Sequence, residues 1–186
     1  MKYFTADLHL GHANILKYCN RPFDNTDEMD AVISNNIFET LDPHDELYIV
    51  GDLTFDERIA ADFFAVLQGT CRAYVHYIWG NHDKGRVRRA IKDVADSVHE
   101  RMYLKINERK IVLDHFAGRV WRDSHFGSWQ LYGHTHAGLK PKGKQYDVGV
   151  DNNDFQLVSL DQVIEIMKTL PENENFIPKD KRRPGK

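Results

Sequence analysis

The sequence predicts an α/β fold in which two β-sheets pack together and helices lie outside them. Three observations lead to this prediction. Residues 1–94 alternate short apolar strands with helical apolar patterns, which is typical of a largely parallel sheet. Residues 102–159 contain mostly further short strands, which favour a second sheet. Several strands end at Gly, Asp, Asn or His, and α/β proteins bind ligands at such strand ends.

In the first 70 residues, two apolar strands are interspersed with three helices. The expected elements are strands at residues 3–6 and 47–50 and helices at residues 13–18, 27–41 and 59–68. Thr26 is the expected N-cap of the long helix, with Asp27 and Glu28 favourable in its first turn. Gly69 is expected to end the third helix, because glycine readily adopts the backbone conformation that terminates helices.

The rest of the chain contains more strands than helices. The expected elements are strands at residues 74–79, 102–106, 110–113, 130–132, 146–150 and 156–159 and helices at residues 84–94 and 160–167. The segment from Pro171 is rich in proline and charge, and residues 179–186 are basic. We therefore expect one domain over residues 1–170, followed by a flexible basic tail over residues 171–186.

Composition limits the classes of function. The chain has 186 residues, enough for a sizeable core, and a net charge of −3, which provides no general attraction to nucleic acid or anionic membranes. Its two cysteines do not form a disulfide framework or a thiolate zinc motif. No apolar stretch approaches the length of a signal peptide core or a membrane span. These features predict a cytoplasmic, soluble protein and indicate no oligomeric state.

Five strands are followed by residues that can bind metal ions. They are Asp7 and His9, Asp52, the group Asn81, His82 and Asp83, then His115, and finally His134 and His136. All of them offer oxygen or imidazole donors, which suit Mn²⁺, Fe²⁺, Zn²⁺ or Ni²⁺. There are too many for one ion. Two ions about 3.5–4 Å apart can bind a phosphoryl group between them and acidify a bridging water.

The order of these stretches resembles a known family. Asp7-x-His9, Gly51-Asp52, Gly80-Asn81-His82-Asp83, His115 and Gly133-His134-x-His136 resemble, in order, the five blocks of the calcineurin-like metallophosphoesterases. The resemblance covers roughly residues 1–160. Three shorter stretches are similar to a small, capless bacterial and phage subgroup whose members are mostly described as predicted phosphoesterases. They are Gly11-His12-x-Asn14-Ile15, Arg21-Pro22-Phe23 and the segment of residues 120–129.

The resemblance implies a fold and a set of ligands. The fold is a four-layer αββα sandwich, with two mixed β-sheets flanked by helices. The family pattern assigns Asp7, His9 and His136 to one metal, Asn81, His115 and His134 to the other, and Asp52 to both. By the same analogy His82 lies over the substrate phosphate, as proton donor to the leaving oxygen or as a cationic stabiliser. Asp83 would then hold the His82 imidazole in the useful tautomer, and Asp114 would support His115.

Several other residues have two interpretations. His12 either contacts the phosphate or caps the short helix that follows it. Arg21 either binds a substrate phosphate or is an ordinary surface arginine. Ser124 and His125 form a wall of the substrate site only if the subgroup resemblance holds. The basic residues of the helix at 84–94 either attract a polyanion or form a solvated face, and the solvated face is favoured.

The sequence therefore favours a dinuclear, metal-dependent phosphomonoesterase or phosphodiesterase, with Mn²⁺ as the favoured metal and Fe²⁺, Zn²⁺ and Ni²⁺ as alternatives. In this mechanism a metal-bridging hydroxide attacks phosphorus while His82 assists the leaving group. Two alternatives are a metal-containing scaffold that binds a partner protein without catalysis, and hydrolysis of another bond such as an amide. The short segments between the blocks leave the site open to phosphodiesters, nucleotides or nucleic-acid ends.

Overall fold

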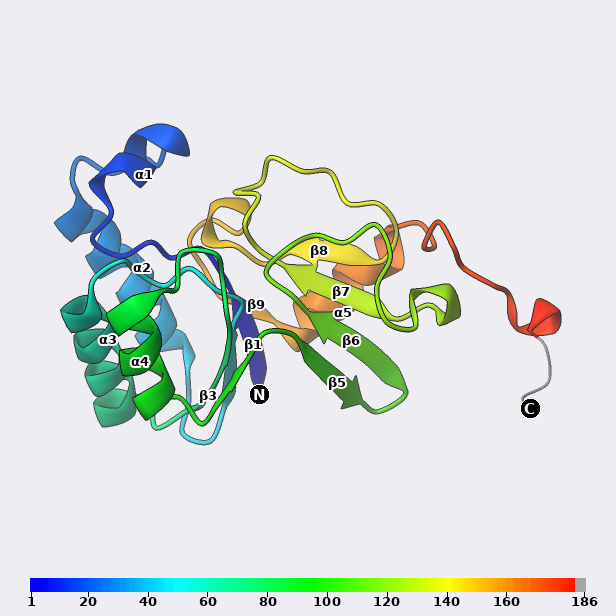
Figure 1. The fold of residues 1–186 in the computed structure, drawn as a ribbon, viewed down its shortest axis with the longest axis horizontal. Coiled ribbons are helices and arrows are strands. Elements are labelled where there is room, and N and C mark those ends of the chain that lie inside the picture. Colours follow the sequence, from blue (N-terminus) through cyan, green and yellow to red (C-terminus); the bar gives the residue numbers. More distant parts are fainter. Residues whose placement is uncertain (183–186) are drawn as a thin grey trace.

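Two mixed β-sheets pack against each other at the centre of the computed structural model, which describes residues 1–182 (Figure 1). One sheet has the strand order β4-β3-β2-β1-β9, in which only β9 is antiparallel to its neighbour. Its strands are β1 (Lys2–Thr5), β2 (Glu46–Ile49), β3 (Tyr74–Ile78), β4 (Ser97–His99) and β9 (Val158–Ser159). This architecture confirms the predicted α/β fold with two mixed sheets.

The second sheet has the order β5-β6-β7-β8, with an antiparallel β5–β6 hairpin and parallel pairing from β6 to β8. Its strands are β5 (Met102–Ile106), β6 (Arg109–Leu113), β7 (Trp129–Tyr132) and β8 (Gln145–Asp147). Beyond the strands, Ala6 forms a parallel bridge with Gly149. This bridge joins the two sheets on the side where the carboxyl ends of β1, β2, β3, β6 and β7 lie. This side is called the shared edge of the sheets.

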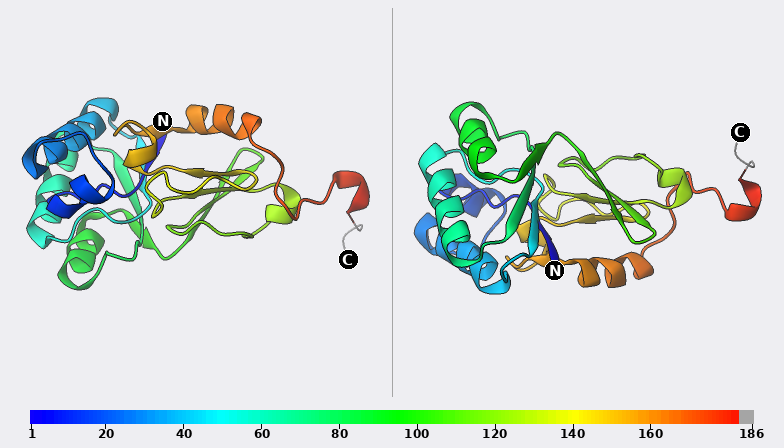
Figure 2. Two further views of the ribbon diagram at one scale, coloured as in Figure 1. Left: turned by 90° about the horizontal axis from the view of Figure 1, so that it is seen from above. Right: turned by 90° about the horizontal axis from the view of Figure 1, so that it is seen from below.

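Four helices cover the outer face of the five-stranded sheet, and Figure 2 shows them on the side away from the second sheet. They are α1 (Ala13–Tyr18), α2 (Thr26–Thr40), α3 (Glu57–Thr70) and α4 (Gly85–Val94). The fifth helix, α5 (Leu160–Thr169), contacts β1, β8 and β9 where the sheets meet. Among the described residues, no helix is both long enough and apolar enough to cross a membrane.

The apolar strands have two buried faces, which explains why they show no polar alternation. In β2, Leu47 and Ile49 belong to the core under the helices, whereas Tyr48 and the following Val50 belong to the core between the sheets. Successive side chains of a strand point to opposite faces, so a strand between two apolar layers needs an unbroken apolar run. The continuous runs in the sequence therefore mark the central strands.

The structure differs from the sequence prediction at several boundaries. The N-cap of α2 is Asn25, not Thr26, because the Asn25 side chain accepts a hydrogen bond from the Glu28 backbone amide. Strand β4 was not predicted, because its three half-buried residues make no apolar run. The structure also contains three short 3-10 helices, η1 (Ser124–Phe126), η2 (Val150–Asn152) and η3 (Lys179–Lys181).

The first part of the predicted tail is anchored to the domain. Asn173 is 4% exposed, and its side chain donates to the carbonyl groups of Ser124 and Ser128 at 2.8 and 3.0 Å. The backbone amide of Ile177 donates to the carbonyl of His125 at 2.8 Å. The end of the predicted tail, residues 183–186, lies outside the described residues.

Candidate metal centre

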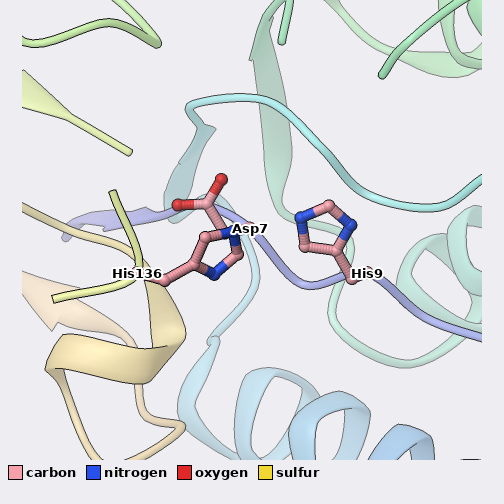
Figure 3. Close-up of side chains that lie close together, drawn as sticks. All are labelled: Asp7, His9 and His136. Carbon is pink, nitrogen blue, oxygen red and sulfur yellow. The ribbon is translucent and has the colours of Figure 1, made fainter. Parts of the chain in front are cut away.

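Two groups of Asp and His residues lie at the shared edge of the sheets. Asp7, His9 and His136 each offer a ligand atom within 4.8 Å of the others, as do Asp52, His115 and His134. Figure 3 shows the first group, in which residues from the end of β1 meet a residue from the loop after β7. Either group could hold a metal ion, and both contain only residues predicted to be ligands.

Asn81 and Asp52 complete the arrangement. The side-chain oxygen of Asn81 lies 3.0 Å from Nε2 of His115, which places this amide in the second group. Oδ2 of Asp52 lies 3.3 Å from Nε2 of His115 and 3.8 Å from Nε2 of His9. Asp52 therefore lies between the two groups, and all seven predicted ligands occupy one site.

The backbone at these positions is unusual. Five of the seven predicted ligands have a positive φ angle: Asp7 (59°), His9 (51°), Asp52 (58°), His134 (68°) and His136 (45°). Left-handed backbone is unfavourable for residues with a Cβ atom, at roughly 1–2 kcal/mol each. Such conformations concentrate at functional sites, because other interactions must hold the chain in place.

A glycine also makes room for the shared carboxylate. A Cβ atom on Gly80 would lie 2.1 Å from Oδ1 of Asp52 and 2.8 Å from its backbone nitrogen. Neither distance is compatible with a side chain, so the loop after β3 can approach Asp52 only at a glycine. The glycine that begins the Gly-Asn-His-Asp motif is therefore required by packing in the site.

Several buried ligand atoms have no partner among the described residues. They are Oδ1 of Asp7 and both ring nitrogens of His9. Leaving a buried polar atom without a hydrogen bond costs about 1–3 kcal/mol, so native structures rarely retain one without a reason. A cation bound by Asp7 and His9 would satisfy these atoms. The nitrogen and oxygen donors present fit a divalent transition metal.

The electrostatics of the ligands reflect their crowding. Burial raises the pKa of Asp7 to about 7, although His115 and His136 lower it. Burial lowers the pKa of His9 to about 3, although Asp52 raises it. Burial alone would lower the pKa of His115, but the hydrogen bond to Asp52 and the charge of Asp7 raise it to about 9. Without metal, Asp7 and His115 therefore hold protons near neutral pH that a cation would displace, whereas His9 does not.

Hydrogen bonds from the protein orient two of the imidazoles. Nδ1 of His115 lies 2.8 Å from the carbonyl oxygen of Val50, which can only accept, so this nitrogen carries the hydrogen. Nδ1 of His136 lies 2.7 Å from Oδ2 of Asp151 in the same way. In both residues Nε2 is left for a metal, as is usual for metal-binding histidines whose other nitrogen is held.

Arg21 supports this arrangement, and neither of its two interpretations is correct: it is not a surface arginine, and its side chain is too buried to bind a substrate phosphate. Its side chain is 0% exposed. Nε and a terminal nitrogen donate to the two oxygens of Asp151, both at 2.8 Å. Other donors reach the carbonyl groups of Asp7 and Leu8 at 2.7 and 2.8 Å. With its donors directed inward, Arg21 fixes the β1 loop and, through Asp151, His136.

Asp151 was missed by sequence reasoning. It lies in η2, immediately after the strand predicted at residues 146–150. An acidic residue directly after a predicted strand is the same signal that identified Asp7 and Asp52. The signal was present, but no motif drew attention to it.

The predicted role of Asp83 is wrong. Its carboxylate is buried and turned away from the His82 ring: Oδ2 accepts from the amides of Gly80 and Asp52 at 2.7 and 3.1 Å, and Oδ1 accepts from the Tyr77 hydroxyl at 2.9 Å. Asp83 therefore holds the two loops that carry Asp52 and His82. It fixes the backbone and does not set the His82 tautomer.

Asp114 likewise does not support the His115 ring. Its carboxylate accepts from Arg101 Nε at 2.6 Å and from the amide of Phe116 at 3.1 Å. His115 is held instead by Val50.

Ser124 and His125 do not line the metal centre. They lie in η1, which precedes β7, whereas His134 follows β7. The first and last residues of a strand lie at opposite ends of the strand. Figure 1 shows η1, the yellow-green helical turn, at the end of β7 away from β1. Ser124 is buried, and its hydroxyl accepts from Asn175 at 2.9 Å, so it anchors the segment after α5.

His82 and His12 do lie beside the metal groups. The His82 side chain is 43% exposed, and its Nε2 lies 4.0 Å from Oδ2 of Asp52. The ring of His12 lies 5.6 Å from that of His9. His12 occupies the N-cap position of α1 but makes no side-chain capping bond. The capping interpretation is therefore wrong, and contact between His12 and a substrate phosphate stays a prediction.

The fold and the site define a two-sheet α/β protein with Asp and His groups that could bind metal ions. No model of a known protein family matches the chain. Uncharacterized protein MJ1445 of Methanocaldococcus jannaschii is 30% identical over 177 residues, which cover 89% of this chain and 90% of that protein. The chain therefore belongs to the same family as MJ1445.

A solved structure shares the fold. The crystal structure of the protein of unknown function AQ665 from Aquifex aeolicus superposes with a TM-score of 0.72, at 21% sequence identity, over 89% of this chain and 98% of that one. At this identity the similarity concerns the fold alone.

Proposed function

We propose that the protein is a dinuclear, metal-dependent phosphoesterase of the calcineurin-like type. The main support is the position of Asp52, whose Oδ2 lies within 3.8 Å of a histidine from each metal-binding group. Asp52 belongs to the second group and also lies near the first, and a carboxylate in this position suits a pair of adjacent ions. The motif order, the positive φ angles and the unpartnered ligand atoms point in the same direction.

The residues of the chain divide the work. Two divalent ions, with Mn²⁺ favoured over Fe²⁺, Zn²⁺ and Ni²⁺, would supply Lewis acidity and a lowered water pKa at this site. The seven ligands would set the distance between the two ions. Arg21 and Asp83 hold the loops that carry these ligands in place. In the reaction, water adds to phosphorus and the P–O ester bond breaks. His82 gives its proton to the leaving oxygen and is reprotonated from solvent.

The test is an activity assay with matched variants. The purified protein with Mn²⁺ is expected to hydrolyse bis(p-nitrophenyl) phosphate or p-nitrophenyl phosphate, to lose activity with a chelator and to regain it with Mn²⁺. His82→Ala is expected to retain both ions and lose about 100-fold or more in kcat on an alkyl phosphate ester, whose alkoxide leaving group needs the donated proton, and to lose less on the p-nitrophenyl esters. Asp52→Asn is expected to lose bound metal.

Metal content, measured by elemental analysis of the same preparations, separates the two roles. A folded, metal-loaded protein that is inert toward a panel of monoesters, linear diesters and cyclic diesters would rule out the proposal. Equal metal loss in His82→Ala and Asp52→Asn would contradict the assignment of His82.

A further inference from the structure

Two exposed phenylalanines lie against the histidines of the metal centre. Phe55, Phe116 and Phe126 are 47%, 49% and 45% exposed, whereas a large apolar ring normally lies in the core. Phe126 is in η1, at the far end of β7. Phe55 follows the Asp52 loop and Phe116 follows His115, so these two rings border the site.

Phe55 contacts three histidines at once. Its ring centre lies 4.7 Å from that of His12, 4.8 Å from that of His82 and 5.9 Å from that of His9. The His12 and His82 rings meet it edge to face, at interplanar angles of 78° and 69°. These contacts fix the ring beside His82 while nearly half of the residue faces solvent. An aromatic surface held in this way is available to stack with a planar group.

Phe55 also borders a hollow with basic walls. The hollow has a volume of about 280 Å³ and lies between the start of α3 and the start of α4, and its lining includes Arg58, Lys84 and Arg86. Of the two acidic residues there, Glu57 pairs with Arg86 at 3.4 Å, and Asp56 caps α3 by accepting from the amide of Arg58 at 2.7 Å. The three cationic side chains outnumber these two carboxylates. Within residues 1–182, Arg58 and Lys84 form no ion pair.

We propose that the substrate is a nucleotide phosphodiester whose base stacks on Phe55 and whose next phosphate lies against Lys84 and Arg58. This inference rests on the proposed phosphoesterase function and specifies its substrate class. The Phe55 ring lies beside His82 and also lines the basic hollow, so the order of the three features is that of a reacting phosphate, a base and a second phosphate. Aromatic rings beside basic side chains are the usual means of binding single-stranded nucleic acid.

The experiment compares two esters with the same leaving group. The first is the p-nitrophenyl ester of thymidine 5′-monophosphate, which carries a base, and the second is methyl p-nitrophenyl phosphate, which carries none. The ratio of their kcat/KM values reports the contribution of the base. Phe55→Ala is expected to lower this ratio by about 5- to 150-fold, the range for loss of one stacked base.

Two matched variants make the comparison specific. Phe55→Trp is expected to keep the high ratio, because it retains an aromatic face. Phe126→Ala removes an equally exposed phenylalanine away from the site and is expected to leave kcat/KM unchanged for both esters. A Phe55→Ala ratio equal to that of the wild type overturns the inference, while metal-dependent hydrolysis of both esters leaves the proposed function in place. Wild type that hydrolyses neither ester with Mn²⁺ instead refutes the proposed function.

The flanking phosphate is tested by adding a 3′-phosphate to the thymidine ester. We expect wild type to have the higher kcat/KM on the 3′-phosphorylated ester. Lys84→Gln is expected to lower the ratio of the two kcat/KM values by about threefold or more, as expected for one exposed cation at low salt. An equal effect of Lys84→Gln on the two thymidine esters overturns the placement of the second anion in the hollow.

Discussion

At the scale of single residues, Arg21 is the most informative side chain outside the ligand set. Its planar fork contacts both oxygens of Asp151, and Asp151 holds Nδ1 of His136. A lysine could place one charge there but could not make two parallel hydrogen bonds. A lysine would therefore hold Asp151 less firmly, and the His136 ring, whose orientation depends on Asp151, would be less well fixed.

We predict that Arg21→Lys and Asp151→Asn weaken metal binding about 10- to 100-fold, which is the usual effect of removing a group that orients a metal-binding histidine. Titration of the metal-free protein with Mn²⁺ measures the change. Arg119→Lys is the matched control, because Arg119 forms an exposed pair with Glu174 at 2.9 Å. Wild-type affinity in Arg21→Lys would show that His136 does not depend on this contact.

The ligands also predict how metal binding depends on pH. Burial raises the pKa of Asp7 to about 7, and the hydrogen bond to Asp52 contributes to raising the pKa of His115 to about 9, against the effect of its burial. Below these values both groups hold a proton that a metal must displace. Mn²⁺ affinity should therefore fall as pH decreases, by about tenfold per pH unit for each displaced proton. Affinities measured from pH 6 to pH 8 that do not change would contradict this prediction.

The roles that the sequence predicted wrongly are those of single side chains. The sequence places Asp83 directly after His82, but it does not show that the Asp83 carboxylate turns inward to the amides of Gly80 and Asp52. Side-chain direction at the end of a strand depends on the neighbouring loop, which comes from residues about 30 positions earlier. The buried position of Arg21 has the same origin, because its partner Asp151 is 130 residues away.

At the scale of secondary-structure elements, the strands that carry ligands were predictable and the outer elements were less so. β2 contains the buried apolar run Leu47–Ile49 and β3 is apolar except for His76, whereas β4 has three half-buried residues and no apolar run. Strand direction could also have excluded Ser124 and His125. They precede β7, so they lie at the opposite end of that strand from His134.

The loop after β3 allows a test with two glycines. We predict that Gly80→Ala reduces bound metal at least tenfold, because its Cβ would lie 2.1 Å from Oδ1 of Asp52, the carboxylate between the two groups. Gly69→Ala is the control. Gly69 does not end the helix as expected but lies within α3, which continues to Thr70, and its Cβ would meet no atom within 4 Å. Alanine there should raise the free energy of unfolding by about 0.5–1 kcal/mol through helix propensity.

Elemental analysis gives the metal content of both variants, and urea unfolding gives their stability. Full metal occupancy in Gly80→Ala would mean that the loop can move away from Asp52. In that case the close approach would not be needed for the site.

At the scale of the whole molecule, the candidate metal centre connects the two sheets. Asp7 and Asp52 follow β1 and β2 of the five-stranded sheet, whereas His115 and His134 follow β6 and β7 of the other. Apart from the apolar core between the sheets, the connections at the shared edge of the sheets include the Ala6–Gly149 bridge. An ion held from both sides would oppose their separation.

We therefore predict that metal stabilises the fold as a whole. A ligand that binds only the folded state, at a free concentration of 100 times its Kd, adds about 2.7 kcal/mol. For a chain of this size each kcal/mol shifts Tm by about 2–4 °C, so saturating Mn²⁺ should raise Tm by roughly 5–10 °C over the chelated protein. Thermal unfolding followed by circular dichroism measures the shift. Asp52→Asn should lose most of it, because that carboxylate serves both groups. An equal Tm with Mn²⁺ and with chelator would show that the ligands do not hold the sheets together through a metal.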